Sequence, residues 1–305
     1  MRLKVCGLDV FFYFWRTFDL RMRTSLIITT YNRPRVLSLV LQTVARQSEL
    51  PDEVIIADDG STDSTAKAIK NVQKSFPIPI IHVRQEDNGF RVARVRNLGA
   101  YKASGDFLIY VDGDMLLHKE FVKSHKRLIR PGRFLHGPRV LVSKSLTRKI
   151  LDTGLIPRIN PLRVALSHRF NMIHSTLLSR IFSSESTKYK SRACNLSVYK
   201  SDFVQVNGFN EDFIGWGEED SEFTWRLMRS GLKKIKVRFS TVGYHLDHGN
   251  NNELADLEHL AKNIEIFQSI RNEMTPRCEN GYSNHVPVPV LVYKSPSVGK
   301  LRRRG

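Results

Sequence analysis

From residue 25 onward, short apolar runs alternate with longer stretches in which apolar residues recur every three or four positions. The short runs predict buried strands, and they are residues 25–30 (SLIITT), 53–58 (EVIIAD), 78–83 and 106–111 (DFLIYV). Between them the spacing predicts helices, the first opened by Pro34 and the third covering residues 91–103. Strands alternating with helices of this length predict a doubly wound α/β fold with a mostly parallel sheet flanked by helices.

The second half of the chain is less regular. It predicts a strand over 194–199, a helix over 219–230, a strand over 234–244 and a helix over 254–268. The last helix places Leu257, Leu260, Ala261, Ile264 and Phe267 on one face. We expect an N-terminal segment (1–23), one domain (24–270) and an extended or disordered basic tail (271–305). Within the domain we distinguish residues 24–125, a basic insert (139–190), residues 191–250 and the C-terminal helix.

The charge of the chain changes this picture. Its 305 residues hold 48 Lys and Arg against 30 Asp and Glu, a net charge of +18, which implies a polyanionic neighbour. No helix-turn-helix, RRM or zinc pattern is present, so we favour an anionic membrane surface over nucleic acid. Two segments suit it: residues 1–23, where an apolar run at 10–15 lies among arginines, and residues 139–180, with eight basic residues and one acid. For residues 1–23, a helix packed on the surface of the domain itself remains the alternative.

The apolar runs and the cysteines bear on location. No run approaches the ~20 apolar residues of a membrane-spanning helix, so we expect a cytoplasmic protein that binds a membrane peripherally. The three cysteines, Cys6, Cys194 and Cys278, are far apart and odd in number. They predict reduced thiols rather than a disulfide framework or a structural zinc site.

Polar residues follow three of the predicted strands, and ligands bind at the carboxyl ends of strands in open α/β sheets. No glycine-rich phosphate loop follows the first strand, so another group must neutralise any ligand phosphates. Asp112 and Asp114, one residue apart on a glycine-containing turn, can both reach one hard divalent cation such as Mn²⁺ or Mg²⁺.

Several motifs in order resemble family-two glycosyltransferases, over about residues 24–250. They are TTYNR (29–33), DDGSTD (58–63), NG (88–89) with Arg94, Arg96 and Asn97, and VDGD (111–114). Residues 87–125 are similar to the donor-site half of bacterial chondroitin-polymerase-type enzymes. NGFNE (207–211) and GWGEED (215–220) resemble the acceptor-side motif of β-1,4-galactosyltransferases and polypeptide N-acetylgalactosaminyltransferases. The resemblance implies the GT-A fold.

The resemblance also implies a donor site. Asp58 or Asp59 would bind the uracil edge, and Tyr31 would pack against the base. Fixed cations would lie near the diphosphate, for which the fork of donors on arginine is suited; these are Arg33, Arg94 and Arg96, with Thr30 and Asp112 completing the set. A solvated helix face remains the alternative for Arg94 and Arg96.

On the acceptor side, Trp216 would offer an apolar platform for a sugar ring, and a carboxylate would take the proton of the attacking hydroxyl. The motif assigns the base to Asp220 and acceptor orientation to Glu219, but Glu218 and Ser221 depart from the family pattern and leave that division open. The family's third metal ligand, a His after a strand, corresponds to His245, with His248 as the alternative.

Together these features predict an inverting, metal-dependent transferase. It would move a hexose or N-acetylhexosamine from a nucleotide-diphospho-sugar, expected to be a UDP-sugar, to a saccharide or lipid-linked saccharide acceptor. The setting implied is bacterial surface polysaccharide or lipopolysaccharide synthesis at the cytoplasmic face of the inner membrane. The rival interpretation is a basic nucleic-acid- or membrane-binding protein without catalysis.

Overall fold

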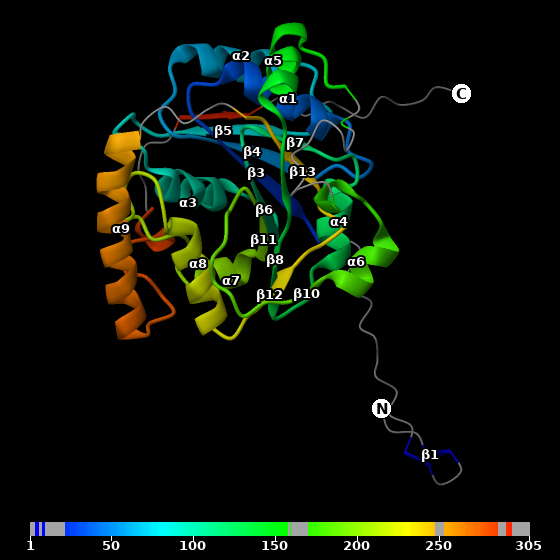
Figure 1. The fold of residues 1–305 in the computed structure, drawn as a ribbon, viewed down its shortest axis with the longest axis vertical. Helices are drawn as coiled ribbons and strands as arrows, with labels where there is room; N and C mark the ends of the chain where they lie inside the picture. Colours follow the sequence, from blue (N-terminus) through cyan, green and yellow to red (C-terminus); the bar gives the residue numbers. More distant parts are fainter. Residues whose placement is uncertain are drawn as a thin grey trace.

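A nine-stranded sheet forms the centre of the protein (Figure 1). The structure is a computed structural model, and it describes residues 4–5, 8–9, 22–157, 159, 170–247, 253–285 and 291–294. The strands run in the order β10-β12-β8-β11-β6-β3-β4-β5-β14. Their bounds are β3 Thr24–Thr30, β4 Glu53–Asp58, β5 Ile80–Arg84, β6 Phe107–Asp112, β8 Arg133–His136, β10 Ser184–Glu185, β11 Asn195–Tyr199, β12 Lys233–Lys236 and β14 Leu291–Lys294.

The middle of this sheet is the parallel unit that the sequence predicts. Strands β6, β3, β4 and β5 are neighbours and run parallel. The strands on either side make the sheet mixed: β11 lies antiparallel to β6 and β8, and β14 antiparallel to β5. Of the eight pairings between the described strands of this sheet, four are parallel, so "mostly parallel" fits only its centre.

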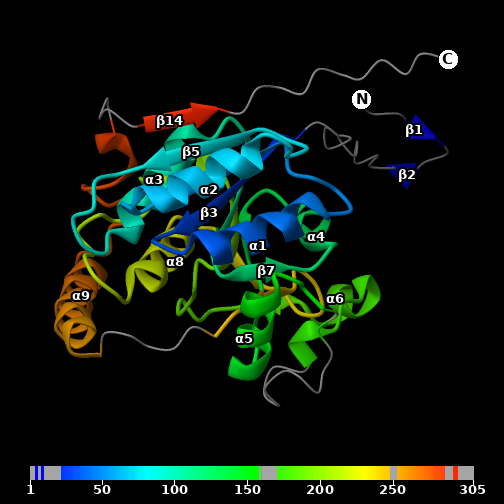
Figure 2. The same cartoon turned by 90° about the horizontal axis from the view of Figure 1, so that it is seen from above.

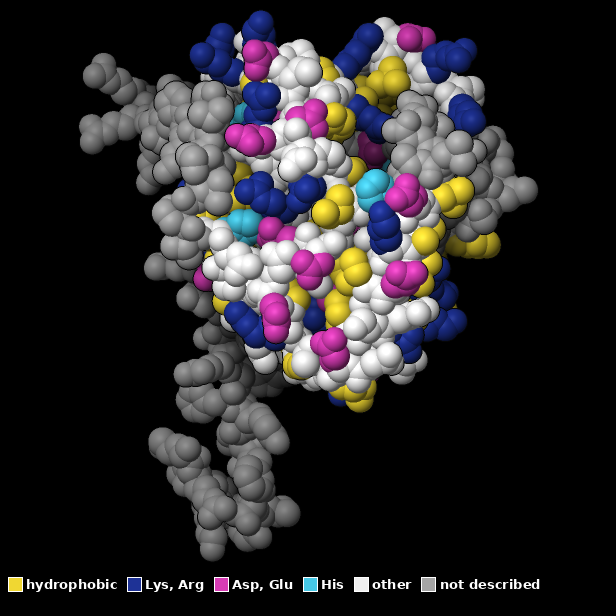
Figure 3. Space-filling model, turned by 90° about the vertical axis from the view of Figure 1, so that its left-hand side faces the viewer, with side chains coloured by type: hydrophobic (Ala, Val, Ile, Leu, Met, Phe, Trp, Pro, Cys, Tyr) yellow, Lys and Arg dark blue, Asp and Glu magenta, His cyan; other side chains and the backbone are white. Residues whose placement is uncertain are grey.

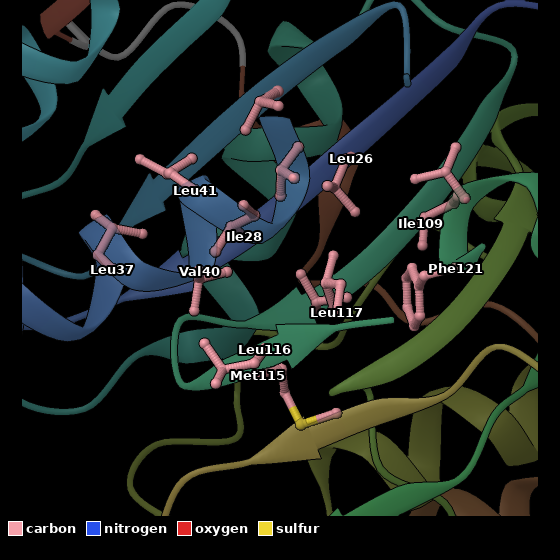
Figure 4. Close-up of a cluster of buried hydrophobic side chains, with 14 of the residues drawn as sticks. Leu26, Ile28, Leu37, Val40, Leu41, Ile109, Met115, Leu116, Leu117 and Phe121 are labelled. Carbon is pink, nitrogen blue, oxygen red and sulfur yellow. The ribbon is translucent and has the colours of Figure 1, made fainter. Parts of the chain in front are cut away.

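Helices cover both faces of the sheet (Figures 1 and 2). The helices are α1 Pro34–Ala45, α2 Asp63–Gln73, α3 Val92–Lys102, α4 Phe121–Leu128, α5 Lys144–Thr153, α6 Thr176–Phe182, α7 Lys200–Gln205, α8 Glu219–Arg229 and α9 Glu253–Glu273. Successive residues of a strand point to opposite faces. Leu26 and Ile28 of β3 therefore join a core with α1, α2 and α4 (Figure 4), while Ile27 joins a second core with α3, α7 and α8.

A small second sheet lies beside the end of β6. It consists of β7 (Met115–Leu117), β13 (Gly243–His245) and β9 (Arg139–Leu141), in the order β7-β13-β9. The single strand expected over 234–244 is wrong: β12 belongs to the large sheet and β13 to the small one. Two residues between these strands, Phe239 and Thr241, have positive φ values of 56° and 48°. A positive φ is incompatible with extended backbone and so interrupts the strand.

The C-terminal region also differs from the expectation. Helix α9 continues to Glu273, and the expected apolar face is only partly covered: Phe267 is buried against Trp225, whereas Leu257 is 59% exposed. The tail expected to be extended from 271 folds back as far as residue 285, because Asn207 donates hydrogen bonds to the carbonyls of Cys278 and Glu279. Residues 286–290 and 295–305 lie outside the described part.

At the other end, Lys4–Val5 (β1) pairs with Leu8–Asp9 (β2). The remainder of the 1–23 segment up to residue 21 lies outside the described part, as do 158, 160–169 and 248–252. Among the described helices, none has the length and hydropathy needed to cross a lipid bilayer.

Candidate active site

Three strand ends meet at one edge of the parallel unit. The register pairs Thr30 of β3 with Asp58 of β4, and Thr29 with Asp112 of β6. The loops that follow are tied together, because the backbone N–H of Asn32 donates to Ser61 Oγ at 2.8 Å, and the Asn32 side chain accepts from the Thr62 N–H. The polar residues after these strands therefore form one surface, as their positions in the sequence predict.

The two acids after β4 have different surroundings. Asp58 is completely buried and accepts hydrogen bonds from His82 at 2.8 Å and from the Ser61 N–H. Asp59 accepts from Gln85 and from the Arg91 N–H. Burial raises the pKa of Asp59 to about 6, although these two hydrogen bonds act in the opposite direction. Both acids are buried, with Asp58 0% and Asp59 4% exposed, and because Asp59 is the slightly more accessible of the two we take it as the candidate for the base edge.

Three more of the expected donor residues border this surface. Tyr31 is 45% exposed, and its hydroxyl donates to Asp87 Oδ2 at 3.1 Å. The Nη1 atom of Arg33 lies 3.6 Å from the Oδ2 atom of Asp114. Arg94 donates to Gln85 Oε1 at 2.9 Å and so reaches the partner of Asp59.

The expected metal ligands lie around the turn between β6 and β7. Gly113 packs so closely on β3 that a Cβ there would come 2.5 Å from the Thr29 carbonyl oxygen, which the absence of a side chain permits. His245 pairs with Met115 in the small sheet, and its Nε2 lies 3.5 Å from Asp114 Oδ1. Asp112 instead accepts from Thr29 Oγ1 at 3.0 Å.

A carboxylate on this turn and an imidazole on the neighbouring strand β13 are donors that suit Mn²⁺ and related divalent ions. In the described ranges, however, no three His, Cys, Asp or Glu side chains converge as a metal site. The pair Asp114–His245 offers two donors of the types that a divalent ion accepts, and Asp112 ends the strand β6 that leads into this turn. The alternative ligand, His248, lies outside the described residues.

Arg96 joins the two halves of the site. Its guanidinium donates to Asp220 Oδ1 at 2.8 Å and to Glu219 Oε1 at 3.3 Å, and it lies 3.4 Å from Asp112 Oδ1. The Arg96 side chain is only 5% exposed. It is therefore not part of a solvated helix face, and it holds three acid groups from two distant motifs together. Its expected place near the diphosphate stays a prediction.

The charges of this cluster determine its protonation. Burial alone would lower the pKa of Arg96, but the nearby charges of Asp220, Asp112 and Glu219 outweigh it and raise the pKa above its usual value. Burial raises the pKa of Glu219 to about 8, helped by the charge of Asp220 and opposed by that of Arg96. Burial likewise raises the pKa of Asp112 against the effect of Arg96.

The acceptor-side loop presents an aromatic ring next to these acids. Trp216 is 56% exposed and is followed by Gly217, whose φ of 112° is readily adopted by glycine. Helix α8 begins directly afterwards at Glu219. Asp220 accepts a second hydrogen bond, from the Ala193 N–H at 2.8 Å. The Gly215 N–H donates to the carbonyl of Phe90, whose side chain is 44% exposed.

Sequence reasoning missed several supporting residues. His82, Gln85 and Ala193 contact Asp58, Asp59 and Asp220, respectively. The local sequence around these three residues gives no sign of a role in the site, because each contact joins two separate elements of the fold. Phe90 could have been identified from the sequence, since it directly follows the Asn88-Gly89 pair of the donor motif.

Comparisons with known sequences agree with this geometry. Residues 25–183 match the model of glycosyl transferase family 2, and residues 176–249 match that of the N-terminal domain of galactosyltransferase. Validoxylamine A glucosyltransferase of Streptomyces hygroscopicus subsp. limoneus is 31% identical over 80% of this chain and 55% of its own length. Chondroitin synthase of Escherichia coli is 29% identical over 75% of this chain and 35% of its own length. The chain thus spans about half or less of these two relatives.

Solved structures share the fold. Mannosyltransferase PcManGT from Pyrobaculum calidifontis, in complex with GDP-Man and Mn²⁺, has a TM-score of 0.56 at 17% identity and covers 82% of this chain and 64% of its own. S. aureus TarS 1-349, in complex with UDP-GlcNAc, has a TM-score of 0.53 at 19% identity and covers 88% and 77%. The family model covers more than half of the chain, and the sheet is that of the GT-A fold. The chain therefore has the GT-A fold, and it belongs to glycosyl transferase family 2.

Proposed function

We propose that the chain transfers a hexose or N-acetylhexosamine from a UDP-sugar to a saccharide acceptor, with inversion at the anomeric carbon. The observation that carries this proposal is the contact of one buried guanidinium, Arg96, with both the Asp112 turn and the Glu219–Asp220 pair. A leaving-group site and an acceptor-side carboxylate must lie next to each other for a single displacement, and this contact supports that arrangement.

On the donor side, Asp59 would bind the uracil edge and Tyr31 would pack against the base. Tyr31 is half-exposed and is linked to Asp87, so its ring is available and oriented. Arg33 and Arg94 are the partly exposed cations of this edge and would lie near the diphosphate. Thr30 and Asp112 would complete the donor contacts.

Asp114 and His245, with Asp112, would hold a divalent ion, Mn²⁺ or Mg²⁺. When bound, that ion would neutralise the diphosphate and favour its departure. The separation of 3.5 Å between Asp114 and His245 supports them as partners in one coordination shell. A relative of the same fold was solved with Mn²⁺.

Asp220 would take the proton from the acceptor hydroxyl. Both of its oxygens accept hydrogen bonds, from Arg96 and from the Ala193 N–H, and these two contacts hold the carboxylate in place. Glu219, whose pKa of about 8 keeps it protonated at neutral pH, would donate a hydrogen bond that orients the acceptor. The exposed ring of Trp216 would support a sugar ring of the acceptor.

The relatives support a setting in polysaccharide synthesis, since one of them is a chondroitin synthase. We extend this to surface polysaccharide or lipopolysaccharide of a bacterium, with a lipid-linked saccharide as the acceptor at the cytoplasmic face of the inner membrane. The test is to incubate the purified chain with a panel of nucleotide sugars and Mn²⁺ and to follow release of the nucleotide. We expect UDP-sugars to be consumed; consumption of only GDP- or CMP-sugars would contradict the donor assignment.

A further inference from the structure

Helix α6 is oriented opposite to an ordinary surface helix. Its serine, Ser179, is buried, whereas Leu177 and Ile181 are 67% and 63% exposed and Phe182 is 49% exposed. An amphipathic helix of a globular domain normally turns its apolar side toward the core. Leu178 of the same helix is half-buried and the Phe182 ring packs on Phe239, but Leu177 and Ile181 face away from the described residues.

The exposed apolar side chains extend beyond the helix. Phe170 is 74% exposed and Ile173 is 41% exposed. With Leu177, Ile181 and Phe182 they form what we call the α6 patch, which holds five of the fourteen exposed large hydrophobic residues among those described, within 13 consecutive positions. Single exposed apolar residues are ordinary, but a group of this kind marks an interaction surface. Helix α6 lies at the periphery of the molecule in both views (Figures 1 and 2).

Three exposed basic residues lie next to the patch. Arg127 of α4 donates to Thr176 Oγ1 at 3.0 Å, Arg180 belongs to α6 itself, and the Arg238 N–H donates to Ser183 Oγ at 3.0 Å; all three side chains are exposed. We call these three residues the basic rim. Two acids of the same region, Glu120 and Glu185, are each paired with a lysine. On the face that carries α9, by contrast, basic and acidic side chains are interspersed (Figure 3).

We infer that the α6 patch docks the protein on an anionic lipid surface. Leucine, isoleucine and phenylalanine on a projecting helix can enter the boundary between headgroups and acyl chains, while the basic rim meets lipid phosphates. A symmetric dimer through the same patch would bring the two basic rims together, and their repulsion disfavours that occupant. The inference extends the proposed function, because it gives a lipid-linked acceptor a surface on which to meet the enzyme.

A short piece of chain connects the α6 patch to the candidate active site. The Ser175 N–H donates to the Phe239 carbonyl at 2.9 Å, and the rings of Phe182 and Phe239 are 5.5 Å apart. Six residues after Phe239 the chain reaches His245 in β13. Lipid contact at α6 therefore lies close along the chain to the proposed metal site.

The test is co-sedimentation of the full chain with vesicles of phosphatidylcholine alone or mixed with phosphatidylglycerol. The double variant Leu177→Ser/Ile181→Ser removes two exposed side chains and should weaken binding to the mixed vesicles by about tenfold to a hundredfold. Arg127→Gln/Arg180→Gln should weaken it as well and remove most of its salt dependence. Controls on other faces, Leu257→Ser and Lys67→Gln/Lys70→Gln, should bind as the unaltered protein does.

Unchanged vesicle binding by Leu177→Ser/Ile181→Ser would overturn the inference, as would equal binding to phosphatidylcholine alone. A dimer that dissociates in this variant while vesicle binding persists would also overturn it and would assign the patch to a second copy. Transfer to a water-soluble saccharide should be the same in all variants. Absence of that transfer in the unaltered protein would count against the proposed function and leave the vesicle result untouched.

Discussion

Replacing Arg96 by methionine should destabilise the protein much more than the same change at Arg94, two residues earlier. Methionine approximates the length of the arginine side chain and removes its charge. In the structure the Arg96 guanidinium lies within 3.4 Å of Asp112, Glu219 and Asp220, and its side chain is 5% exposed. Without it, the acid groups of Asp112, Glu219 and Asp220 would remain in a largely buried site with no cation between them.

The expected magnitude follows from burial and the number of partners. Removing one member of a buried ion pair typically costs about 3–5 kcal/mol, because a buried charge is left uncompensated. We expect Arg96→Met to lose about that amount of unfolding free energy near neutral pH. Arg94 has one hydrogen bond, to Gln85, and a 3.9 Å contact with Glu211, and its side chain is 28% exposed. Arg94→Met should therefore cost about 1 kcal/mol or less.

The assay is urea unfolding followed by circular dichroism, with EDTA present so that no metal compensates the acids. The deficit of Arg96→Met should be largest at about pH 8 and should shrink toward about pH 5, because protonation removes the unpaired carboxylate charge. A merely packing role for Arg96 would give a deficit that does not change with pH. If Arg96→Met is no less stable than Arg94→Met, the reasoning is refuted.

Three further predictions concern catalysis, metal and pH. Asp220→Asn should lower kcat by about 10² or more while donor binding stays nearly unchanged, and Glu219→Gln should raise the acceptor KM more than it lowers kcat; steady-state kinetics giving near-normal kcat for Asp220→Asn would contradict the assignment of the base. EDTA should abolish transfer and Mn²⁺ or Mg²⁺ restore it, and Asp114→Asn should be inactive with an unchanged circular dichroism spectrum; full turnover in EDTA would refute the metal site. Because the pKa of Glu219 is raised to about 8 in the folded protein, its contribution to stability is complete below the unfolded pKa of about 4.5 and is lost as the pH rises through about 8. Thermal unfolding at a series of pH values should show this loss in the unaltered protein and a smaller one in Glu219→Gln, whereas identical pH profiles would oppose it.

The parallel unit could be predicted because each of its strands carries a local signal. Residues 25–30 and 53–58 are apolar runs followed by polar turns, and such runs identify strands without knowledge of their partners. The 234–244 segment could not be divided into two strands in this way, since neither Phe239 nor Thr241 is a residue type whose sequence signals the positive φ that it adopts. The folded tail depends in the same way on Asn207, about 70 residues earlier in the chain.

In the candidate site, the residue types were predictable but their partners were not. Arg94 and Arg96 are two positions apart on a helix and so point to different sides, which is a sequence signal that they could not both face one diphosphate. The structure directs Arg94 to Gln85 and Arg96 to the carboxylates. Which acids Arg96 would meet depends on how α8 packs beside α3, and no local pattern encodes that.

The most direct test of the proposed reaction is the configuration of the bond that it forms. Once the nucleotide-sugar panel has identified the donor, proton NMR of the product formed on a water-soluble saccharide gives the anomeric configuration of the new linkage. A single displacement at the site joined by Arg96, with Asp220 as the base, predicts a β-glycoside from an α-linked UDP-sugar. A product that keeps the α configuration would contradict the account.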